Sequence, residues 1–137
     1  MKIKKITSVL FLLLLPFLLS AQVKDCTKFK NGKFRLKNPK TKKIAIITRD
    51  GDKQTEKMQD EPEEYDFDIK WIDACSYTVT PTPATSARNK KVVDLGTMTV
   101  TITKMTDSSY TQTVKIANYP KYRRTDEMII VKEKTEL

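Results

Sequence analysis

The stretch DFDIKWIDACSYTVTPT (residues 66–82) has the clearest period-two pattern in the chain, and it decides the fold class. Side chains two residues apart point to the same face of a β-strand, so alternating apolar residues predict strands with one buried face. Here the odd-numbered positions form an apolar stripe that only Asp73 interrupts: Phe67, Ile69, Trp71, Cys75, Tyr77 and Val79.

The length of this stripe excludes a single straight strand. Residues 65–79 would extend for about 50 Å as one strand, whereas a compact domain of this size has a radius of gyration of only about 13 Å. We therefore predict two strands, at about 63–71 and 75–80, joined by a turn or sharp bend around Asp73. This arrangement places Trp71 and Cys75 at the same edge of the sheet.

The same alternation recurs along the chain, and helical periodicity is nearly absent. Asp50-Gly51 favours a tight hairpin turn, the polar segment 53–58 is interpreted as an edge strand, and Pro81 and Pro83 predict a loop over residues 80–86. The remaining strands are expected at 33–36, 43–48, 53–58, 97–103, 110–116 and 128–131. Short connections favour an all-β, antiparallel up-and-down meander of about eight strands that forms a small barrel, with a two-sheet β-sandwich as the alternative.

The N-terminus predicts export. Three lysines within residues 1–5 precede an apolar run at 9–19 and then Ser20-Ala21, the pattern of a cleaved signal peptide. The apolar run is shorter than the ~20 residues that span a bilayer. We expect a signal peptide at 1–21, a single secreted or periplasmic β domain at 22–137, and no stable membrane insertion after cleavage. Cleavage would lower the formal net charge from +9 to +6.

Cys26 and Cys75 are the only cysteines of the chain. Disulfides persist in exported proteins, so we predict a Cys26–Cys75 bridge; a free buried thiol and a reactive pair remain the alternatives. Closing a loop of this length stabilises a fold by up to about 4 kcal/mol in the chain-entropy account.

Several catalytic classes are excluded by composition. The chain contains no histidine, which excludes Ser-His-Asp and Cys-His triads and the common zinc sites. Its three glycines are scattered, so no phosphate-binding loop is present. The acidic residues between Asp60 and Asp68 lack the spacing of a calcium loop. We therefore predict no metal and no cofactor, and favour a non-catalytic protein over a carboxylate-dependent hydrolase.

Two binding hypotheses remain. In the first, a small hydrophobic ligand occupies the barrel interior. The side chains expected to line it are Phe34, Phe67, Trp71, Tyr77, Met98, Ile102 and Ile116. The alternative is that these side chains simply fill the interior. In the second, a surface patch binds an anionic polysaccharide, nucleic acid or envelope component, nucleic acid being the least favoured. That patch interleaves an aromatic residue with cations in a predicted loop: Lys121, Tyr122, Arg123 and Arg124.

Three short motifs carry a resemblance to other proteins. An F-x-x-G-x-F motif (residues 29–34) follows Cys26, WIDACSY lies at 71–77, and an M-x-I strand closes the chain at 128–130. Together they resemble a group of short, uncharacterised bacterial proteins that carry an export signal and look lipocalin-like. The resemblance implies a β-barrel and a structural role for these motifs, but no functional residue. True lipocalins are longer and open with G-x-W, so their ligand chemistry is not implied.

Overall fold

A computed structural model of the chain describes residues 25–134, so the predicted signal peptide lies outside the described residues. A short 3-10 helix, η1 (Thr27–Lys30), precedes eight β-strands, and two short α-helices lie between the fifth and sixth strands. The strands are β1 (Asn31–Lys37), β2 (Ile44–Asp50), β3 (Lys53–Met58), β4 (Glu64–Trp71), β5 (Ser76–Pro81), β6 (Met98–Met105), β7 (Ser109–Ile116) and β8 (Tyr119–Val131).

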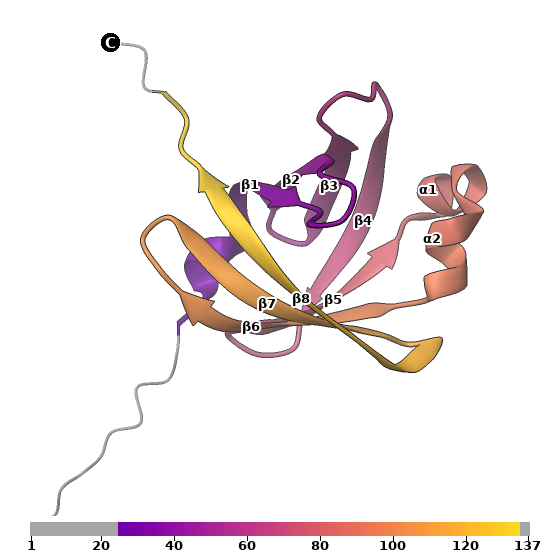
Figure 1. Cartoon of the computed structure of the whole chain (residues 1–137). Coiled ribbons are helices and arrows are strands. Elements are labelled where there is room, and N and C mark those ends of the chain that lie inside the picture. Colours follow the sequence, from indigo (N-terminus) through magenta and orange to yellow (C-terminus); the bar gives the residue numbers. More distant parts are fainter. Residues whose placement is uncertain (1–24, 135–137) are drawn as a thin grey trace, which may run out of the picture.

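The eight strands form one closed antiparallel barrel in which each strand pairs with its neighbours in sequence (Figure 1). Pairing of β1 with β8 closes the barrel. This confirms the predicted up-and-down meander and excludes the sandwich. The interpretation of residues 53–58 as an edge strand is wrong, because β3 pairs with both β2 and β4.

The stripe that predicted the fold runs along β4 and β5. Phe67 pairs with Pro81 at one end of the two strands, and Trp71 pairs with Tyr77 at the other. The chain reverses between Ile72 and Cys75. Phe67, Ile69, Tyr77 and Val79 are buried. The predicted strand pair and the break at Asp73 are therefore confirmed. The Asp50-Gly51 turn is also present, with Gly51 at a φ of +61°, a conformation that glycine adopts without steric cost.

Two segments that were predicted as loops have regular structure. Residues 83–95 contain α1 (Pro83–Arg88) and α2 (Lys90–Leu95). Thr82 caps α1 by accepting a hydrogen bond from the Thr85 amide, and Pro83 occupies the first helical turn, where its missing N–H costs nothing. Each helix has only six residues, too few to show a helical period. No helix within residues 25–134 is long and apolar enough to cross a bilayer.

The second such segment is the start of β8. The strand was expected at 128–131 but begins at Tyr119, and it pairs with β7 at Tyr119 and from Arg123 to Ile129. Residues 119–125 are exposed, and only Asp126 and Met128 of this strand are buried. The early half of β8 therefore lacks the apolar alternation that marks a strand in sequence.

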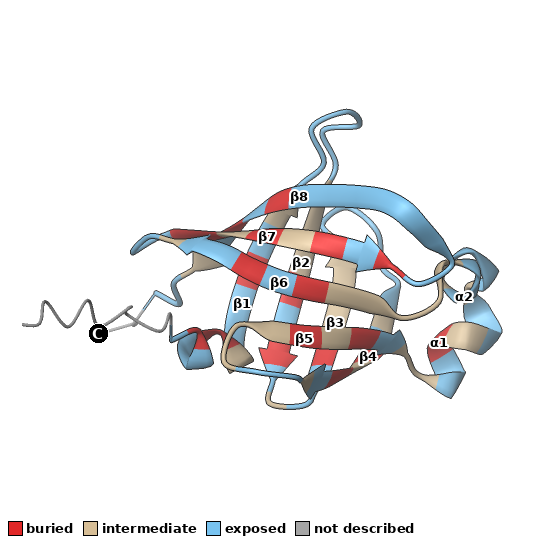
Figure 2. Cartoon of the chain, turned by 90° about the horizontal axis from the view of Figure 1, so that it is seen from below, coloured by how far each residue is buried: buried red, intermediate tan, exposed pale blue. Residues whose placement is uncertain are grey.

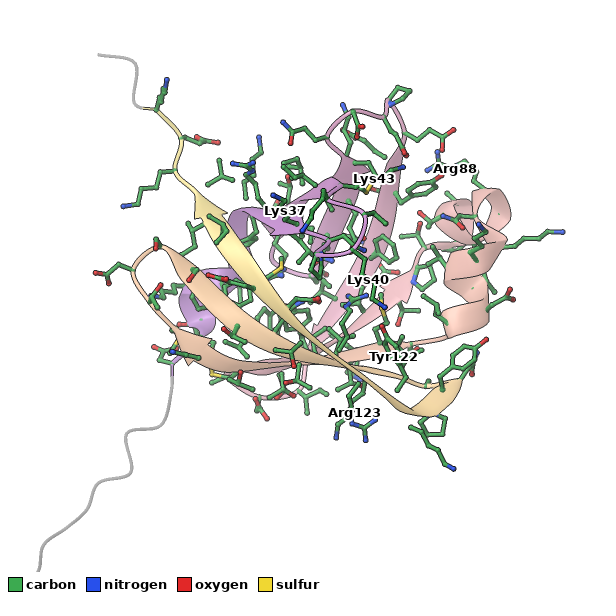
Figure 3. The ribbon with its side chains drawn as sticks, viewed as in Figure 1. Lys37, Lys40, Lys43, Arg88, Tyr122 and Arg123 are labelled. Atoms are coloured by element: carbon green, nitrogen blue, oxygen red, sulfur yellow. A yellow bond between two sulfur atoms is a disulfide. The ribbon has the colours of Figure 1, made fainter. Side chains whose placement is uncertain are left out.

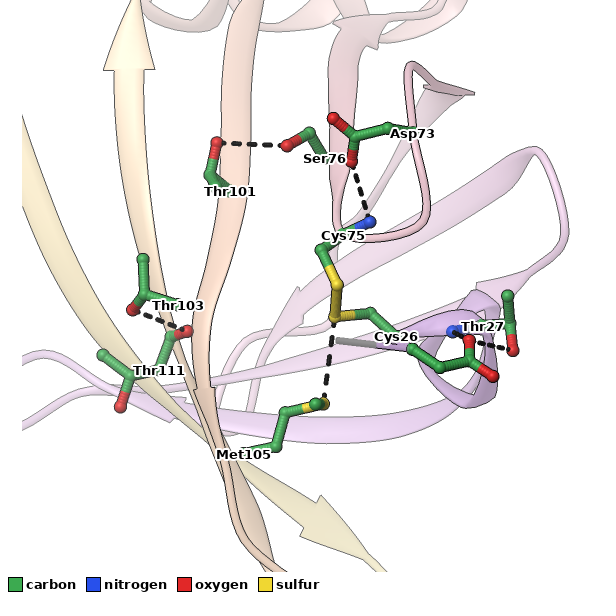
Figure 4. Close-up of a disulfide and its surroundings, with 10 residues drawn as sticks. Cys26, Thr27, Asp73, Cys75, Ser76, Thr101, Thr103, Met105 and Thr111 are labelled. Carbon is green, nitrogen blue, oxygen red and sulfur yellow. Dashed lines mark hydrogen bonds between the residues drawn. A yellow bond between two sulfur atoms is a disulfide. The ribbon is translucent and has the colours of Figure 1, made fainter. Parts of the chain in front are cut away.

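One end of the barrel is closed by η1 and a disulfide. Phe29 of η1 is buried, and its ring packs 4.4 Å from that of Tyr110 between centroids. Cys26 is bonded to Cys75 with a Cα–Cα distance of 5.0 Å, which confirms the predicted bridge (Figure 4). The Met105 thioether contacts the Cys26 sulfur at 3.8 Å. The bridge fastens the N-terminal segment to the turn between β4 and β5.

The opposite end carries the β1–β2, β3–β4 and β7–β8 connections together with α1 and α2. Figure 2 shows the helices at one end of the barrel and the buried residues along the strands between the two ends. Val92 and Leu95 of α2 are partly buried and pack against the barrel core. We call this the open end, because the interior contains a cavity there.

Candidate ligand-binding site

The barrel interior contains a cavity of about 190 Å³. Its walls are mostly apolar and include Phe67, Val79, Val100 and Val114, while Val92 and Leu95 of α2 line the side toward the open end. Polar side chains line it as well, from four different strands: Arg49, Gln54, Glu56, Gln112 and Arg124. An apolar space with a few convergent polar groups is typical of a small-molecule site.

Arg49 forms the polar floor of the cavity. Only 3% of this residue is exposed, and its guanidinium donates four hydrogen bonds. Nε donates to Gln54 Oε1 at 2.8 Å, and Nη1 donates to the Phe29 carbonyl at 2.9 Å. Nη2 donates to the hydroxyls of Tyr77 and Tyr110 at 2.8 and 2.7 Å. These bonds link η1, β2, β3, β5 and β7 at a single side chain.

Aromatic rings surround the Arg49 guanidinium, and no carboxylate among residues 25–134 bonds to it directly. Its guanidinium carbon lies 4.7 Å from the Phe34 ring centroid and 4.8 Å from that of Tyr77, at cation–π distance. Burial raises the pKa of Tyr77 and Tyr110, so both phenols stay protonated. Arg49 is therefore a satisfied structural cation rather than a group awaiting a ligand.

Glu56 is the acid of the interior. Its Oε1 accepts a hydrogen bond from Gln54 Nε2 at 2.8 Å, and Oε2 has no hydrogen-bond partner within residues 25–134. Burial raises the pKa of Glu56 above its usual range, and the Gln54 hydrogen bond offsets this only in part. Gln54 thus lies between the buried Arg49 guanidinium and the half-buried Glu56 carboxyl group. Glu56 lines the cavity, so its carboxyl group can contact a ligand.

Arg124 lines the cavity near its outer side. Nε of Arg124 donates to Asp126 Oδ2 at 2.9 Å, and Gln112 donates to the same oxygen at 3.4 Å. Asp126 is 8% exposed, whereas the Arg124 side chain is 43% exposed. The ion pair therefore extends from the buried interior to solvent.

A second hollow, of about 230 Å³, lies beside the cavity between the β1–β2 loop and β8. Leu36 and Arg124 line both spaces, so the two hollows meet at these side chains. Lys37, Lys40 and Tyr122 also line the second hollow, and Figure 3 shows how they lie around it.

The residues predicted to bind an interior ligand fall into three positions. Phe67, Tyr77 and Met98 line the cavity. Phe34, Ile102 and Ile116 are buried in the core without lining it. Trp71 is partly buried at the closed end, where its ring centroid lies 4.7 Å from that of Tyr77. Its Nε1 is buried and has no hydrogen-bond partner in the described part of the chain.

The predicted anionic-partner residues do not share one environment. Lys121 and Arg123 are exposed, and Arg123 donates to the carbonyls of Pro120 and Tyr122. Tyr122 is 45% exposed and lines the second hollow, while Arg124 lines both hollows. All four residues are exposed, but Lys121 and Arg123 lie on the outer surface of the hairpin, whereas Tyr122 and Arg124 line the hollows.

Sequence reasoning missed the polar residues of the interior. Arg49 lies two positions after buried Ile47, and Gln112 lies two positions before buried Val114. Their place in the alternation was the signal that could have found them. Their polarity argued for the outer face, because charged and amide side chains are mostly exposed.

Within the part of the chain that the structure describes, no group of three or more cysteine or acidic side chains lies close enough together to hold a metal ion. Comparison with family models, with curated proteins and with solved structures finds no significant match in any of the three.

Proposed function

We propose that this chain is a non-catalytic, exported binding protein that holds a small, mainly apolar ligand inside its barrel. The observation that carries the proposal is the interior cavity, with its apolar walls and a carboxyl oxygen of Glu56 that has no hydrogen-bond partner among residues 25–134. A barrel of eight strands is wide enough to hold one small ligand. The cavity is smaller than the roughly 300–1,000 Å³ of drug-sized sites, so the ligand is small.

The proposal also covers the cellular location of the protein and the group of proteins that its motifs resemble. The Cys26–Cys75 disulfide fits an oxidising compartment, and the N-terminal pattern of the sequence favours export to the periplasm or beyond. The barrel is consistent with the lipocalin-like group that the sequence motifs resemble.

Native mass spectrometry of protein purified from its own host tests the proposal. We expect a mass excess of one small molecule that organic extraction removes. A bound molecule recovered in stoichiometric amount supports the proposal, and apo protein in repeated gentle preparations counts against it.

A matched pair of variants tests whether the ligand binds in the interior cavity. Met98→Trp adds bulk to the cavity wall, whereas Thr101→Trp adds the same ring to an exposed position on the same strand. With an apolar fluorescent probe such as anilinonaphthalene sulfonate, we expect Met98→Trp to weaken binding at least tenfold and Thr101→Trp to leave it unchanged. Equal binding by the two variants would exclude the interior as the site, provided that both melt cooperatively.

A second candidate function rests on the β7–β8 hairpin. Tyr119 and Tyr122 are 53% and 45% exposed beside Lys121 and Arg123, a combination suited to an anionic polymer. Retention of the protein on a heparin column at 150 mM salt, lost in a Lys121→Ser, Arg123→Ser variant, would support this surface over the interior.

A further inference from the structure

The barrel wall is incomplete where its first and last strands meet. β1 and β8 pair at only four positions, from Lys33–Val131 to Leu36–Met128. Nearer the open end, β8 continues back to Tyr119, and within residues 25–134 this part pairs with β7 and not with β1. In Figure 1 this part of the β7–β8 hairpin extends away from β1. A gap therefore lies between Leu36 and the early half of β8.

The second hollow occupies this gap. Its lining comes from the end of β1, the β1–β2 loop and β8, and it shares Leu36 and Arg124 with the interior cavity. A molecule could therefore lie partly in each space. One end would contact polar groups at the surface, and the other would contact the apolar walls around Val79 and Val114.

The charges around the gap favour an anion. Lys37, Lys40 and Arg124 line the second hollow, and among its described lining residues Asp126 is the one acid. Asp126 already accepts a hydrogen bond from Arg124 Nε. Glu56, which lines the adjoining cavity, also interacts electrostatically with Arg124. The two terminal nitrogens of Arg124 have no hydrogen-bond partner within residues 25–134, and a guanidinium fork is well shaped for carboxylate, sulfate or phosphate oxygens.

We infer that this gap holds the anionic head group of a single-chain amphiphile whose apolar tail lies in the interior cavity. The inference depends on the proposed function and adds the ligand class and its orientation. The reverse orientation would place the anion beside Glu56. Arg49 already donates four of its five N–H groups to protein acceptors, so it offers a head group fewer hydrogen bonds than Arg124 does within the described residues.

Isothermal titration calorimetry with four eight-carbon probes tests the head-group preference. We expect octanoate and octyl sulfate to bind about five- to tenfold more tightly than 1-octanol, and octylammonium to bind most weakly. The comparison of octanoate with octyl sulfate shows which anion the gap prefers. Shortening octanoate to hexanoate should weaken binding about fourfold per methylene, because the tail is buried.

Two arginines supply a matched control. Arg124→Gln should bring octanoate to the affinity of 1-octanol and leave 1-octanol unchanged, because the head-group contact is lost. Arg35→Gln makes the same charge change at an exposed position of β1 that lines neither hollow, and it should bind like the parent protein.

A second variant keeps the test independent of the Arg124–Asp126 pair. Lys37→Gln with Lys40→Gln changes two exposed side chains and should weaken octanoate about threefold while reducing its salt dependence. If 1-octanol binds as tightly as octanoate and all variants match the parent, the inference is overturned while the proposed function stands. If none of the four probes binds, and Met98→Trp leaves dye binding unchanged, the proposed function itself fails.

Discussion

The two ends of the barrel differ in how their polar groups are satisfied. At the closed end, Arg49 is fully enclosed and donates four hydrogen bonds to partners on four other elements, and a disulfide fastens the covering helix. Toward the open end, Glu56 has one carboxyl oxygen without a protein partner, and Arg124 has two such nitrogens within the described residues. Buried polar groups stabilise a fold only when they are paired. The closed end is therefore built for stability, and the open end retains groups that a ligand can satisfy.

The largest effect on stability is expected from Arg49→Met, which removes the buried hydrogen bonds at the closed end. The substitution leaves the Phe29 carbonyl, Gln54 and two tyrosine hydroxyls without their donor, so we expect a loss of about 3–5 kcal/mol in the free energy of unfolding. Urea denaturation measures the loss. Arg35→Met, at an exposed position of β1, is the control and should change stability by less than about 0.5 kcal/mol. Equal stability of the two variants would contradict a structural role for Arg49.

Removing the disulfide should have the next largest effect. Cys26→Ser with Cys75→Ser frees the N-terminal segment and restores the entropy of a loop with a sequence separation of 49, at an expected cost of about 2–4 kcal/mol. Thermal melts of the parent protein with and without reductant provide the matched comparison. A reduced parent as stable as the oxidised one would show that η1 stays docked without the bridge.

The Glu56→Gln variant tests the comparison through the pH dependence of stability. Because burial raises the folded-state pKa of Glu56, the folded state binds its proton more tightly than the unfolded state does. Stability should therefore fall as pH rises from the unfolded value near 4.5 through the folded pKa. We expect Glu56→Gln to melt a few degrees higher than the parent at pH 8 and at the same temperature at pH 3.5. A variant less stable at pH 8 would show that the ionised carboxylate stabilises the barrel.

The smallest effect is expected at the rim of the open end. Tyr119→Ser removes a ring that is 53% exposed, so the free energy of unfolding should change by less than about 0.5 kcal/mol. A loss above about 1 kcal/mol would mean that the β7–β8 hairpin supports the barrel.

Much of the fold followed from alternation in the sequence, because β4 and β5 present buried apolar side chains at every second position. The disulfide followed from a single pair of cysteines. The start of β8 and the two short helices did not follow, because the former is polar on both faces and the latter are shorter than the window in which periodicity is visible.

The polar part of the site could not be predicted in the same way. Phe67, Tyr77 and Met98 were expected in the interior and line the cavity. Arg49, Gln54 and Glu56 were not expected, because a charged or amide side chain indicates the solvent face unless its partners are known. Two partners of Arg49 lie on strands that are distant in sequence, because Tyr77 is 28 residues and Tyr110 is 61 residues from Arg49. Only the closed barrel brings them together.

Amide chemical-shift mapping during titration with octanoate tests the contrast between the two ends most directly. We predict saturable shifts at residues around the open half of the interior, including Leu36, Glu56, Met98 and Arg124, and little change at Cys26, Phe29 and Trp71. Shifts confined to the closed end, or spread over the outer surface without saturation, would contradict the account.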